Sequence, residues 1–202
     1  LRSCMIDAET REIVSQGFPK FFNRGEHKSH DDIFDEQMSA CMAGPAYQPW
    51  ICATEKIDGS LIIRSVIEGK VHFRTRGQLD LGSFEDVVMA EVSKYPPLLV
   101  DTVGPSYSML FEFQHPMFQI VVRPSAPSLT YLGDVDYPAW MVEPHFEPAV
   151  SLDSDGRRFP PEPKVTTFNS IEEMQKFLET AESTEGFVTI VQKYLKTKTE
   201  HP

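Results

Sequence analysis

The order of apolar and polar residues predicts a chain built mainly from short β-strands. Apolar or alternating runs of about four to eight residues, bounded by turn residues, are typical of strands. Two runs around a polar turn at 8–10 predict a strand–turn–strand unit near the start of the chain. The other runs predicted as strands are 49–53, 60–64, 70–77, 107–113, 118–122, 128–133 and 194–198. We expect 107–113 and 118–122 to pair as a hairpin.

Two segments carry the helical period instead. An apolar stripe begins near Ser83, and Pro96–Pro97 predicts its end because proline cannot continue a helix. Residues 169–173 form a capping box, which predicts a second helix up to about residue 181. Residues 30–44 predict a poorly periodic, helix-like segment whose acidic residues are more typical of a solvated face than of metal ligands. The proline-rich stretch 134–165 predicts an ordered excursion rather than a domain linker.

Length and composition limit the class of protein. A chain of 202 residues with 41% hydrophobic and 24% charged residues fits one large globular domain. The sequence contains no apolar run of about 18 residues, no Walker-type phosphate loop and no His-Glu-x-x-His motif. These absences exclude a transmembrane helix, a P-loop site and a zincin site. Three cysteines without a Cys-x-x-Cys pair favour a reducing compartment without structural zinc, so we expect the cytoplasm.

The net charge of −11 is unfavourable for a chain that binds nucleic acid through its overall field. A polynucleotide partner must then be held by a local basic patch, or by a domain outside this sequence. The chain begins at Leu1 rather than at a methionine and stops soon after its last motif. We therefore expect a fragment of a longer protein, lacking flanking N- and C-terminal regions.

The stretch 54–61 places one lysine where a fold does not require it. Lys56 lies between two predicted strands, directly before the turn signal Asp58–Gly59. One interpretation is a β-hairpin whose turn is entered by a solvated lysine. The other is a nucleophile held at a strand end and aimed into a cleft. A lysine amine has a pKa of about 10.4, so a nucleophile of this kind needs neighbouring cations, a metal or desolvation to favour its neutral form.

The residues Lys56-Ile57-Asp58-Gly59-Ser60-Leu61 resemble the nucleotidyl-lysine motif of the covalent nucleotidyltransferases, which include DNA ligases, RNA ligases and mRNA-capping enzymes. DNA ligases and capping enzymes usually carry an arginine two residues after the glycine, where this chain has Leu61. The Ser-Leu pair is similar to that of ATP-dependent RNA ligases of the phage tRNA-repair type, the RNA ligase 1 family. By this resemblance Lys56 is the nucleophile, and Asp58 and Gly59 belong to the nucleotide-binding turn, with Asp58 holding the turn or a metal-bound water.

Two blocks on either side of this motif extend the resemblance. Residues 20–26 match the Lys-Phe-Phe-Asn-x-x-Glu block that precedes the nucleophile in RNA ligases. The resemblance implies that Arg2 and Lys20 contact the ATP phosphates and that Phe22 lies near the nucleotide, although core packing is the alternative for adjacent phenylalanines. Thr75-Arg76-Gly77 matches a Thr/Ser-Lys-Gly block, which makes Arg76 a candidate phosphate or RNA contact.

Glu112 stands in an apolar strand, where a carboxylate is costly unless it has a partner. One interpretation is an edge strand with Glu112 facing water, and the other is a functional acid. Phe111-Glu112-Phe113 resembles a family block in which the glutamate accepts a hydrogen bond from the ribose hydroxyl. The run 128–133 resembles the next family strand, which implies that Leu132 covers one face of the adenine.

The last motifs follow the second predicted helix. Glu185-Gly186-Phe187-Val188 resembles the family's metal-site motif, which implies that Glu185 is the metal carboxylate and that Val188 is the second adenine wall. Two lysines at i and i+2 on a strand share one face. An exposed lysine-rich tail is one interpretation of Lys196 and Lys198, and the resemblance implies that they face the α-phosphate and Lys56.

Taken in order, these blocks resemble an α+β nucleotidyltransferase domain spanning residues 1–202, with antiparallel sheets and flanking helices around an ATP cleft. The resemblance implies that ATP and Mg²⁺ are used and that RNA with 5′-phosphate and 3′-hydroxyl ends is joined through a lysyl-AMP intermediate. The compartment would be the host cytoplasm for a phage-encoded protein. Two alternatives stay open: a DNA ligase or capping-type nucleotidyltransferase, and a non-catalytic nucleotide- or RNA-binding module of the same fold.

Overall fold

The structure is a computed structural model. It describes residues 3–18, 47–101, 107–118, 120–121, 123–136, 141–143, 159–181 and 187–195, with isolated positions between 23 and 36. Side chains are described in these ranges except at 47–50, 136, 141–143 and 187–195. The chain divides into two compact units: residues 1–20 with 57–163, and residues 21–56 with 164–202. The prediction that residues 1–202 form one nucleotidyltransferase domain stays a prediction.

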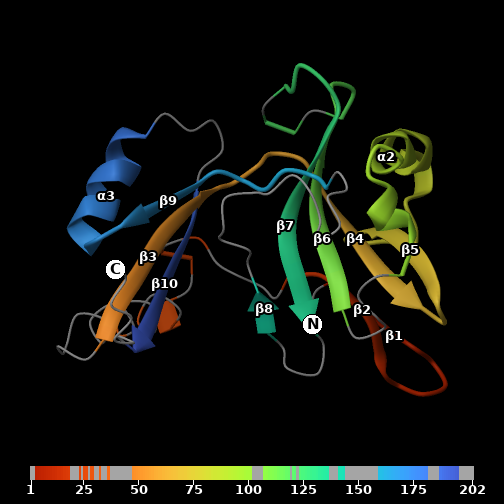
Figure 1. The fold of residues 1–202 in the computed structure, drawn as a ribbon, viewed down its shortest axis with the longest axis horizontal. Coiled ribbons are helices and arrows are strands. Elements are labelled where there is room, and N and C mark those ends of the chain that lie inside the picture. Colours follow the sequence, from red (N-terminus) through yellow and green to blue (C-terminus); the bar gives the residue numbers. More distant parts are fainter. Residues whose placement is uncertain are drawn as a thin grey trace, which may run out of the picture. The chain divides into compact units, whose positions relative to one another are not determined.

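The first unit contains a five-stranded sheet in which every pair of neighbours is antiparallel (Figure 1). The strand order is β5-β4-β6-β7-β8. A tight turn joins the first two of these strands, where Glu68 and Gly69 both adopt positive φ. The bounds are β4 (Ser60–Ile67), β5 (Lys70–Thr75), β6 (Tyr107–Gln114), β7 (Ser128–Asp136) and β8 (Met141–Glu143).

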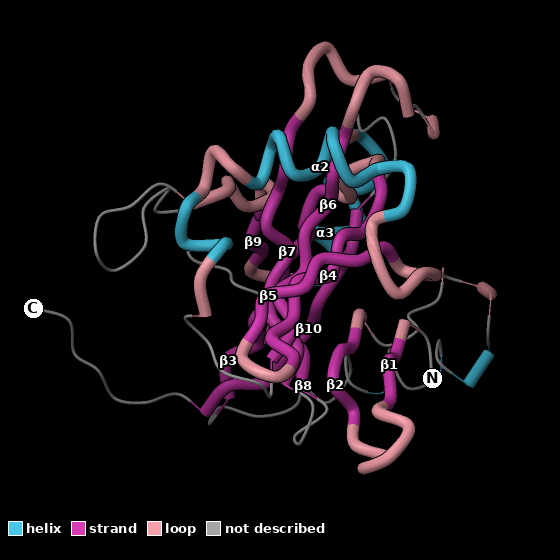
Figure 2. Tube along the Cα trace, turned by 90° about the vertical axis from the view of Figure 1, so that its right-hand side faces the viewer, coloured by secondary structure: helices cyan, strands magenta, loops and turns pink. Residues whose placement is uncertain are grey.

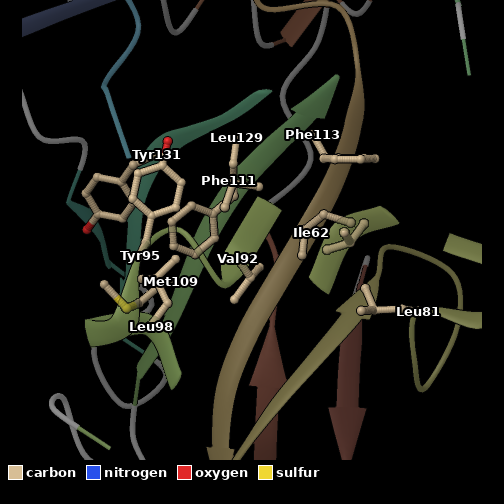
Figure 3. Packing of buried hydrophobic residues seen from close by; sticks show 11 residues of the cluster. Ile62, Leu81, Val92, Tyr95, Leu98, Met109, Phe111, Phe113, Leu129 and Tyr131 are labelled. Carbon is tan, nitrogen blue, oxygen red and sulfur yellow. The ribbon is translucent and has the colours of Figure 1, made fainter. Parts of the chain in front are cut away.

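One face of this sheet packs against helix α2 (Glu85–Val92), which is preceded by the 3-10 turn η1 (Gly82–Phe84) and followed by η2 (Pro96–Leu99). The predicted helix is therefore confirmed, and it ends before Pro96 as expected. Alternate residues of the strands meet the apolar side of α2 in the main core (Figure 3). The buried members of this core are Ile62, Leu81, Val88, Val92, Tyr95, Leu98, Met109, Phe111, Phe113, Leu129 and Tyr131.

A buried arginine on β4 fastens η2 to the same face. The Arg64 side chain is fully buried and donates from Nε to the carbonyl oxygen of Leu98 at 2.8 Å, and from Nη2 to the carbonyl oxygen of Val100. Burial lowers the pKa of Arg64, and the nearby carboxylates of Asp101 and Asp134 oppose that change. The residue therefore satisfies backbone groups at the end of η2 that the helical segment leaves unpaired.

The opposite face of the sheet carries a hairpin formed by β1 (Cys4–Ile6) and β2 (Ile13–Gln16), which confirms the predicted strand–turn–strand unit (Figure 2). Its apolar contacts form a second cluster, in which Ile63, Leu110 and Val135 are buried. Ile13, Phe18, Leu61 and Leu132 pack against this cluster and are half-buried.

The second unit contains a three-stranded antiparallel sheet of order β10-β3-β9 with helix α3 packed on it. Its bounds are β3 (Tyr47–Glu55), β9 (Val165–Phe168), α3 (Ile171–Thr180) and β10 (Phe187–Leu195). The capping box that begins α3 is confirmed, because Ser170 Oγ accepts from the Glu173 amide at 3.1 Å and the Glu173 carboxylate accepts from the Asn169 amide at 3.0 Å.

The hairpin interpretation around Lys56 is wrong. The predicted strands on both sides of Asp58–Gly59 exist, but β3 pairs with β9 and β10, whereas β4 pairs with β5 and β6. The turn signal therefore marks a passage from one sheet to another. The φ angle of Gly59 is not positive, so this glycine does not supply the backbone conformation of a two-residue hairpin turn.

The predicted hairpin over 107–122 is also wrong. Its first strand is β6, but the described residues at 118, 120 and 121 form turns and bends rather than a second strand. The strands beside β6 are β4 and β7, which makes it an interior strand of the sheet. The interpretation of Glu112 as an edge-strand residue facing water is therefore wrong as well.

Most of the helix-like segment predicted at 30–44 lies outside the described residues. No helix in the part of the chain that the structure describes is long and apolar enough to span a membrane. The sheets and helices of the two units confirm the coarse class: in its described part, the chain is a mixed α and β protein with antiparallel sheets and few helices.

Candidate functional site

Pairing between β4 and β6 brings two motifs that are about fifty residues apart in sequence into direct contact. Leu61 lies opposite Glu112, and Ser60 lies opposite Phe113. The approach is closest at Gly59, where an added Cβ would lie 2.4 Å from the carbonyl oxygen of Phe113 and 3.1 Å from Cγ of Glu112. Only glycine fits between these two strands without moving a backbone.

Glu112 lies on the sheet face that α2 does not cover. Its neighbours Phe111 and Phe113 point into the α2 core, so strand alternation places Glu112 on the same side as Leu110. The carboxylate is half-buried on an interior strand, with Leu61 opposite it on β4 and Thr130 opposite it on β7. A carboxylate in such surroundings is a suitable hydrogen-bond acceptor for a polar group of a bound ligand.

Half-buried leucines flank this carboxylate. Leu61 precedes Ile62 on β4, and Leu132 occupies an irregular position on β7, between the pairs Leu110–Gly133 and Phe111–Tyr131. Both leucines pack against the cluster on the face opposite α2. The structure thus places Leu61, Glu112 and Leu132 on one face of one sheet, where apolar side chains and a carboxylate lie together.

Asp58 is buried, with 8% of its surface exposed, and fixes the turn that follows Lys56. Its Oδ2 accepts from the amide of Val121 at 2.7 Å, and its carbonyl oxygen accepts from Nε2 of Gln114 at 3.1 Å. Whether Asp58 also holds a metal-bound water stays a prediction. Sequence reasoning missed Gln114, because a glutamine at the end of a strand gives no signal of a distant backbone partner.

Lys56 is half-buried and directly follows β3. It is the last residue of its unit before the chain enters the other unit at Ile57. The end of β3 is held on both sides: the Glu55 amide donates to the carbonyl oxygen of Lys164 at 2.9 Å, and Glu55 lies opposite Phe187 of β10. The Lys56 backbone therefore leaves a strand end that is paired on both edges.

The register of β10 relates the C-terminal motifs to this strand end. Phe187, two residues after Glu185, lies opposite Glu55, and the Val188 backbone lies opposite Thr54. Leu195 lies opposite Tyr47, eight residues from Glu55, or about 26 Å along a strand at about 3.3 Å per residue. A role for Lys196 and Lys198 beside Lys56 therefore requires the chain to reverse direction after Leu195.

Arg76 is exposed and follows β5. It lines a cavity of about 230 Å³ together with Arg74 and residues 3–6 of the β1 segment. Its role as a phosphate or RNA contact stays a prediction.

Arg74, which sequence reasoning did not single out, holds this region together. It is 3% exposed and donates from Nε to Ser15 Oγ at 2.7 Å and from Nη2 to the carbonyl oxygen of Ser3 at 2.6 Å. Ser65 Oγ in turn donates to Ser15 Oγ at 2.8 Å and contacts Ser108 Oγ at 2.6 Å. This buried network joins the β1–β2 hairpin to β4, β5 and β6.

Six of the predicted site residues lie outside the described residues: Arg2, Lys20, Phe22, Glu185, Lys196 and Lys198. Of Val188 only the backbone is described. Within the described ranges no group of three or more His, Cys, Asp or Glu side chains is arranged to hold a metal ion. The metal assignment rests on Glu185 and stays a prediction.

Comparison with known proteins assigns the class. A family model described as RNA ligase matches residues 1–202, the full length of this chain. A protein of Thermovibrio ammonificans that carries the provisional name RNA ligase is 27% identical over 192 residues, which cover 93% of this chain and 46% of that protein. An RNA ligase of Rhodothermus phage RM378 is 26% identical over 148 residues, covering 60% of this chain and 33% of that protein.

The chain belongs to the RNA ligase family, as the resemblance of its motifs predicted. It spans less than half the length of the two relatives described above.

Proposed function

We propose that this chain is the adenylyltransferase part of an ATP-dependent RNA ligase, with Lys56 as the nucleophile. The observation that carries the proposal is the β4–β6 contact, which packs Gly59 of the lysine motif against Phe113 and Glu112. That contact brings a candidate nucleotide-binding acid to the turn that begins two residues after the lysine. Membership of the RNA ligase family supports the same chemistry.

In the first step the Lys56 amine attacks the α-phosphorus of ATP. A nitrogen–phosphorus bond forms, the bond from the α-phosphorus to the bridging oxygen breaks, and pyrophosphate leaves with that oxygen. The neutral amine loses one of its two protons to solvent as the bond forms. In the second step an oxygen of an RNA 5′-phosphate attacks the phosphorus of the lysyl-AMP. The nitrogen–phosphorus bond breaks, and Lys56 leaves as an amine that takes up a proton from solvent. In the third step an RNA 3′-hydroxyl attacks the activated 5′-phosphorus, and AMP leaves.

The described residues have distinct tasks in this proposal. Glu112 accepts a hydrogen bond from a ribose hydroxyl, which fits a half-buried carboxylate flanked by apolar side chains. Leu132 covers one face of the adenine, and Val188 covers the other. Asp58 and Gly59 hold the turn after Lys56. Arg76 contacts a phosphate of ATP or of RNA.

The remaining tasks fall to residues outside the described ranges. Arg2 and Lys20 bind the ATP phosphates, Phe22 lies near the nucleotide, and Lys196 and Lys198 offset the charge that develops on the α-phosphate. Glu185 would hold Mg²⁺, an ion that prefers oxygen ligands. When bound, the ion would neutralise phosphate charge and favour the neutral form of a lysine amine.

Leu61 and the Lys-Phe-Phe-Asn block favour an RNA ligase over a DNA ligase or a capping-type enzyme. The intact Lys56, Glu185, Lys196 and Lys198 favour an enzyme over a non-catalytic binding module. We propose that the substrate is RNA with 5′-phosphate and 3′-hydroxyl ends. The enzyme would act in RNA repair, in particular tRNA repair, in the cytoplasm.

The proposal is tested by incubating the protein with α-labelled ATP and Mg²⁺, followed by denaturing electrophoresis. We expect label on the protein that is released by acid and survives base, because a phosphorus–nitrogen bond is acid-labile. Label from γ-labelled ATP should be absent, because pyrophosphate has left. A protein that takes no label from α-labelled ATP, or takes it equally from γ-labelled ATP, would overturn the proposed chemistry.

Substitution of Glu112 should separate its hydrogen bond from its charge. Glu112→Ala should lower kcat/KM for ATP by roughly tenfold to a hundredfold, since a hydrogen bond to a charged group contributes about 1.5–3 kcal/mol. Glu112→Gln should lose less, because an amide oxygen still accepts from a ribose hydroxyl.

The control for this prediction is the nucleotide itself. Wild type should use ATP in preference to 2′-deoxy-ATP, and Glu112→Ala should lose that preference. Thr130→Val is the matched control on the neighbouring strand, and it should keep the preference. Equal use of both nucleotides by wild type would remove Glu112 from the ribose.

The C-terminal lysines should differ from their neighbour on β10. Lys196→Ala and Lys198→Ala should each slow lysyl-AMP formation by at least roughly tenfold at saturating ATP, because each removes a cation near developing charge. Lys193→Ala, on β10 opposite Pro49, should change the rate by less than about twofold. A larger loss in Lys193→Ala than in both other variants would mean that the lysine assignments are shifted.

A further inference from the structure

Gln114 is held between two segments that lie far from each other in sequence. The β6–β7 register sets Gln114 opposite Ser128, whose Oγ donates to Gln114 Oε1 at 3.2 Å. Because an amide has one accepting and one donating end, this bond leaves Nε2 free to donate elsewhere. Nε2 donates to the carbonyl oxygen of Asp58 at 3.1 Å. The amide thus links the start of β7 to the turn that follows Lys56.

The same turn is tied to the loop that joins β6 to β7. Val121 in that loop donates its amide to Asp58 Oδ2 at 2.7 Å. The Val121 side chain is 58% exposed, so a backbone hydrogen bond rather than apolar burial holds the loop at this point. An aromatic contact anchors the loop elsewhere: the ring centroids of Phe118 and of Phe84, the last residue of η1, lie 4.5 Å apart. Asp58 is therefore bound through its side chain to one segment and through its carbonyl to another.

We propose that Gln114 is a positioning residue for the transfer of AMP to Lys56. Its hydrogen bond holds the main chain at Asp58 against the end of β6, the strand that carries Glu112. Fixing Asp58 in this way also fixes the direction in which the chain runs from Lys56 into the turn. This inference rests on the proposed function, and it adds a residue outside the motifs that identify the family. Gln114 touches neither the lysine nitrogen nor the ATP in this role; it acts through the backbone of the motif.

Substitution of Gln114 should affect the chemical step more than the stability of the fold. The two bonded segments are the turn next to the nucleophile and the strand that carries the nucleotide-binding acid. Loss of the bond leaves both strands paired, because β4 and β6 retain their backbone ladder from Ser60–Phe113 to Ser65–Ser108. The rate of the chemical step should therefore change more than ATP affinity or thermal stability does.

Three substitutions remove different parts of the link. Gln114→Met keeps the length of the side chain and removes both hydrogen bonds. Gln114→Glu keeps an acceptor for Ser128 and replaces the donor with a carboxylate oxygen that faces the Asp58 carbonyl oxygen. Ser128→Ala removes the bond that orients the amide. The matched controls are Gln175→Met, at an exposed position on α3, and Ser93→Ala, whose hydroxyl donates to the Ala90 carbonyl oxygen on α2.

The experiment measures single-turnover labelling with α-labelled ATP over a range of ATP concentrations, together with amide hydrogen exchange at Val121 without nucleotide. Gln114→Met should lower the rate at saturating ATP by about threefold to tenfold, the factor that corresponds to one hydrogen bond between neutral groups. Gln114→Glu should lower it further, and the ATP concentration for half-maximal rate should change by less than about twofold. Exchange at Val121 should become faster in Gln114→Met, and both controls should match wild type.

A wild-type protein that takes label, combined with a Gln114→Met rate within about twofold of wild type, would overturn the positioning role alone. Unchanged exchange at Val121 in Gln114→Met would overturn it too, and that readout needs no ATP. A rate loss matched by an equal rise in the half-maximal ATP concentration would assign Gln114 to ATP binding instead. A wild-type protein that takes no label would overturn the proposed function.

Discussion

Lys56→Ala should abolish covalent labelling by α-labelled ATP. The amine is the only atom of this residue that attacks phosphorus in the proposed mechanism, and alanine offers no substitute. Lys56→Arg should also abolish labelling, although it keeps the positive charge. A guanidinium group stays protonated above a pH of about 12, so it offers no free electron pair at neutral pH. The measurement is the amount of acid-labile label per mole of protein after denaturing electrophoresis.

The control for the Lys56 variants is a second lysine of the same unit that has no role in the proposed site. Lys176 is exposed on α3, and Lys176→Ala should take label at the wild-type rate. Both Lys56 variants should unfold at the wild-type temperature, because Lys56 is half-buried and follows a strand end that backbone pairing holds. Label on either Lys56 variant at the wild-type rate would show that another residue is the nucleophile.

The strands around Lys56 illustrate how much of the fold could be predicted from sequence. Apolar runs located β3 and β4 correctly, because burial of one or both faces leaves a local pattern that a single sequence displays. Their partners were not predicted correctly. Pairing is decided by residues far away in the chain, and an Asp-Gly pair between two strands is typical of a hairpin. Only the long-range register, Glu55 with Phe187 and Leu61 with Glu112, shows that the two strands belong to different sheets.

The candidate site likewise contains residues that the sequence predicted and residues that it did not. Motif resemblance pointed to Asp58, Gly59 and Glu112, and the structure brings these three together through one strand pair. The motifs gave no signal for Gln114 or for Arg74, whose partners are backbone carbonyls and serine hydroxyls far away in the sequence. Any residue with the right donor at such a position serves equally well, so residue identity alone carries little information there.

The motif glycine shows most clearly why a local pattern is insufficient. An Asp-Gly pair suggests that glycine is needed for positive φ, which other residues rarely adopt. Gly59 is instead needed for space, because a Cβ at this position would lie 2.4 Å from the Phe113 carbonyl oxygen. That oxygen belongs to the backbone of an interior strand, so no side-chain rotation relieves the contact.

Gly59→Ala should therefore impair both stability and chemistry. The free energy of unfolding should fall by about 1–3 kcal/mol, the usual cost of adding a methyl group to a closely packed site. The labelling rate at saturating ATP should fall by about a hundredfold, because β4 must move away from β6 and a displacement of about 1 Å near reacting groups costs that much. Denaturant unfolding and single-turnover labelling measure the two effects separately.

Gly77→Ala supplies the stability control for the same substitution. A Cβ at Gly77 meets no atom within 4 Å, so its free energy of unfolding should stay within about 0.5 kcal/mol of wild type. If Gly59→Ala were as stable as Gly77→Ala and took label at the wild-type rate, the close contact between the lysine motif and β6 would be wrong. Loss of labelling in Gly59→Ala without loss of stability would instead mean that the strands yield locally and that only the geometry of the turn after Lys56 is disturbed.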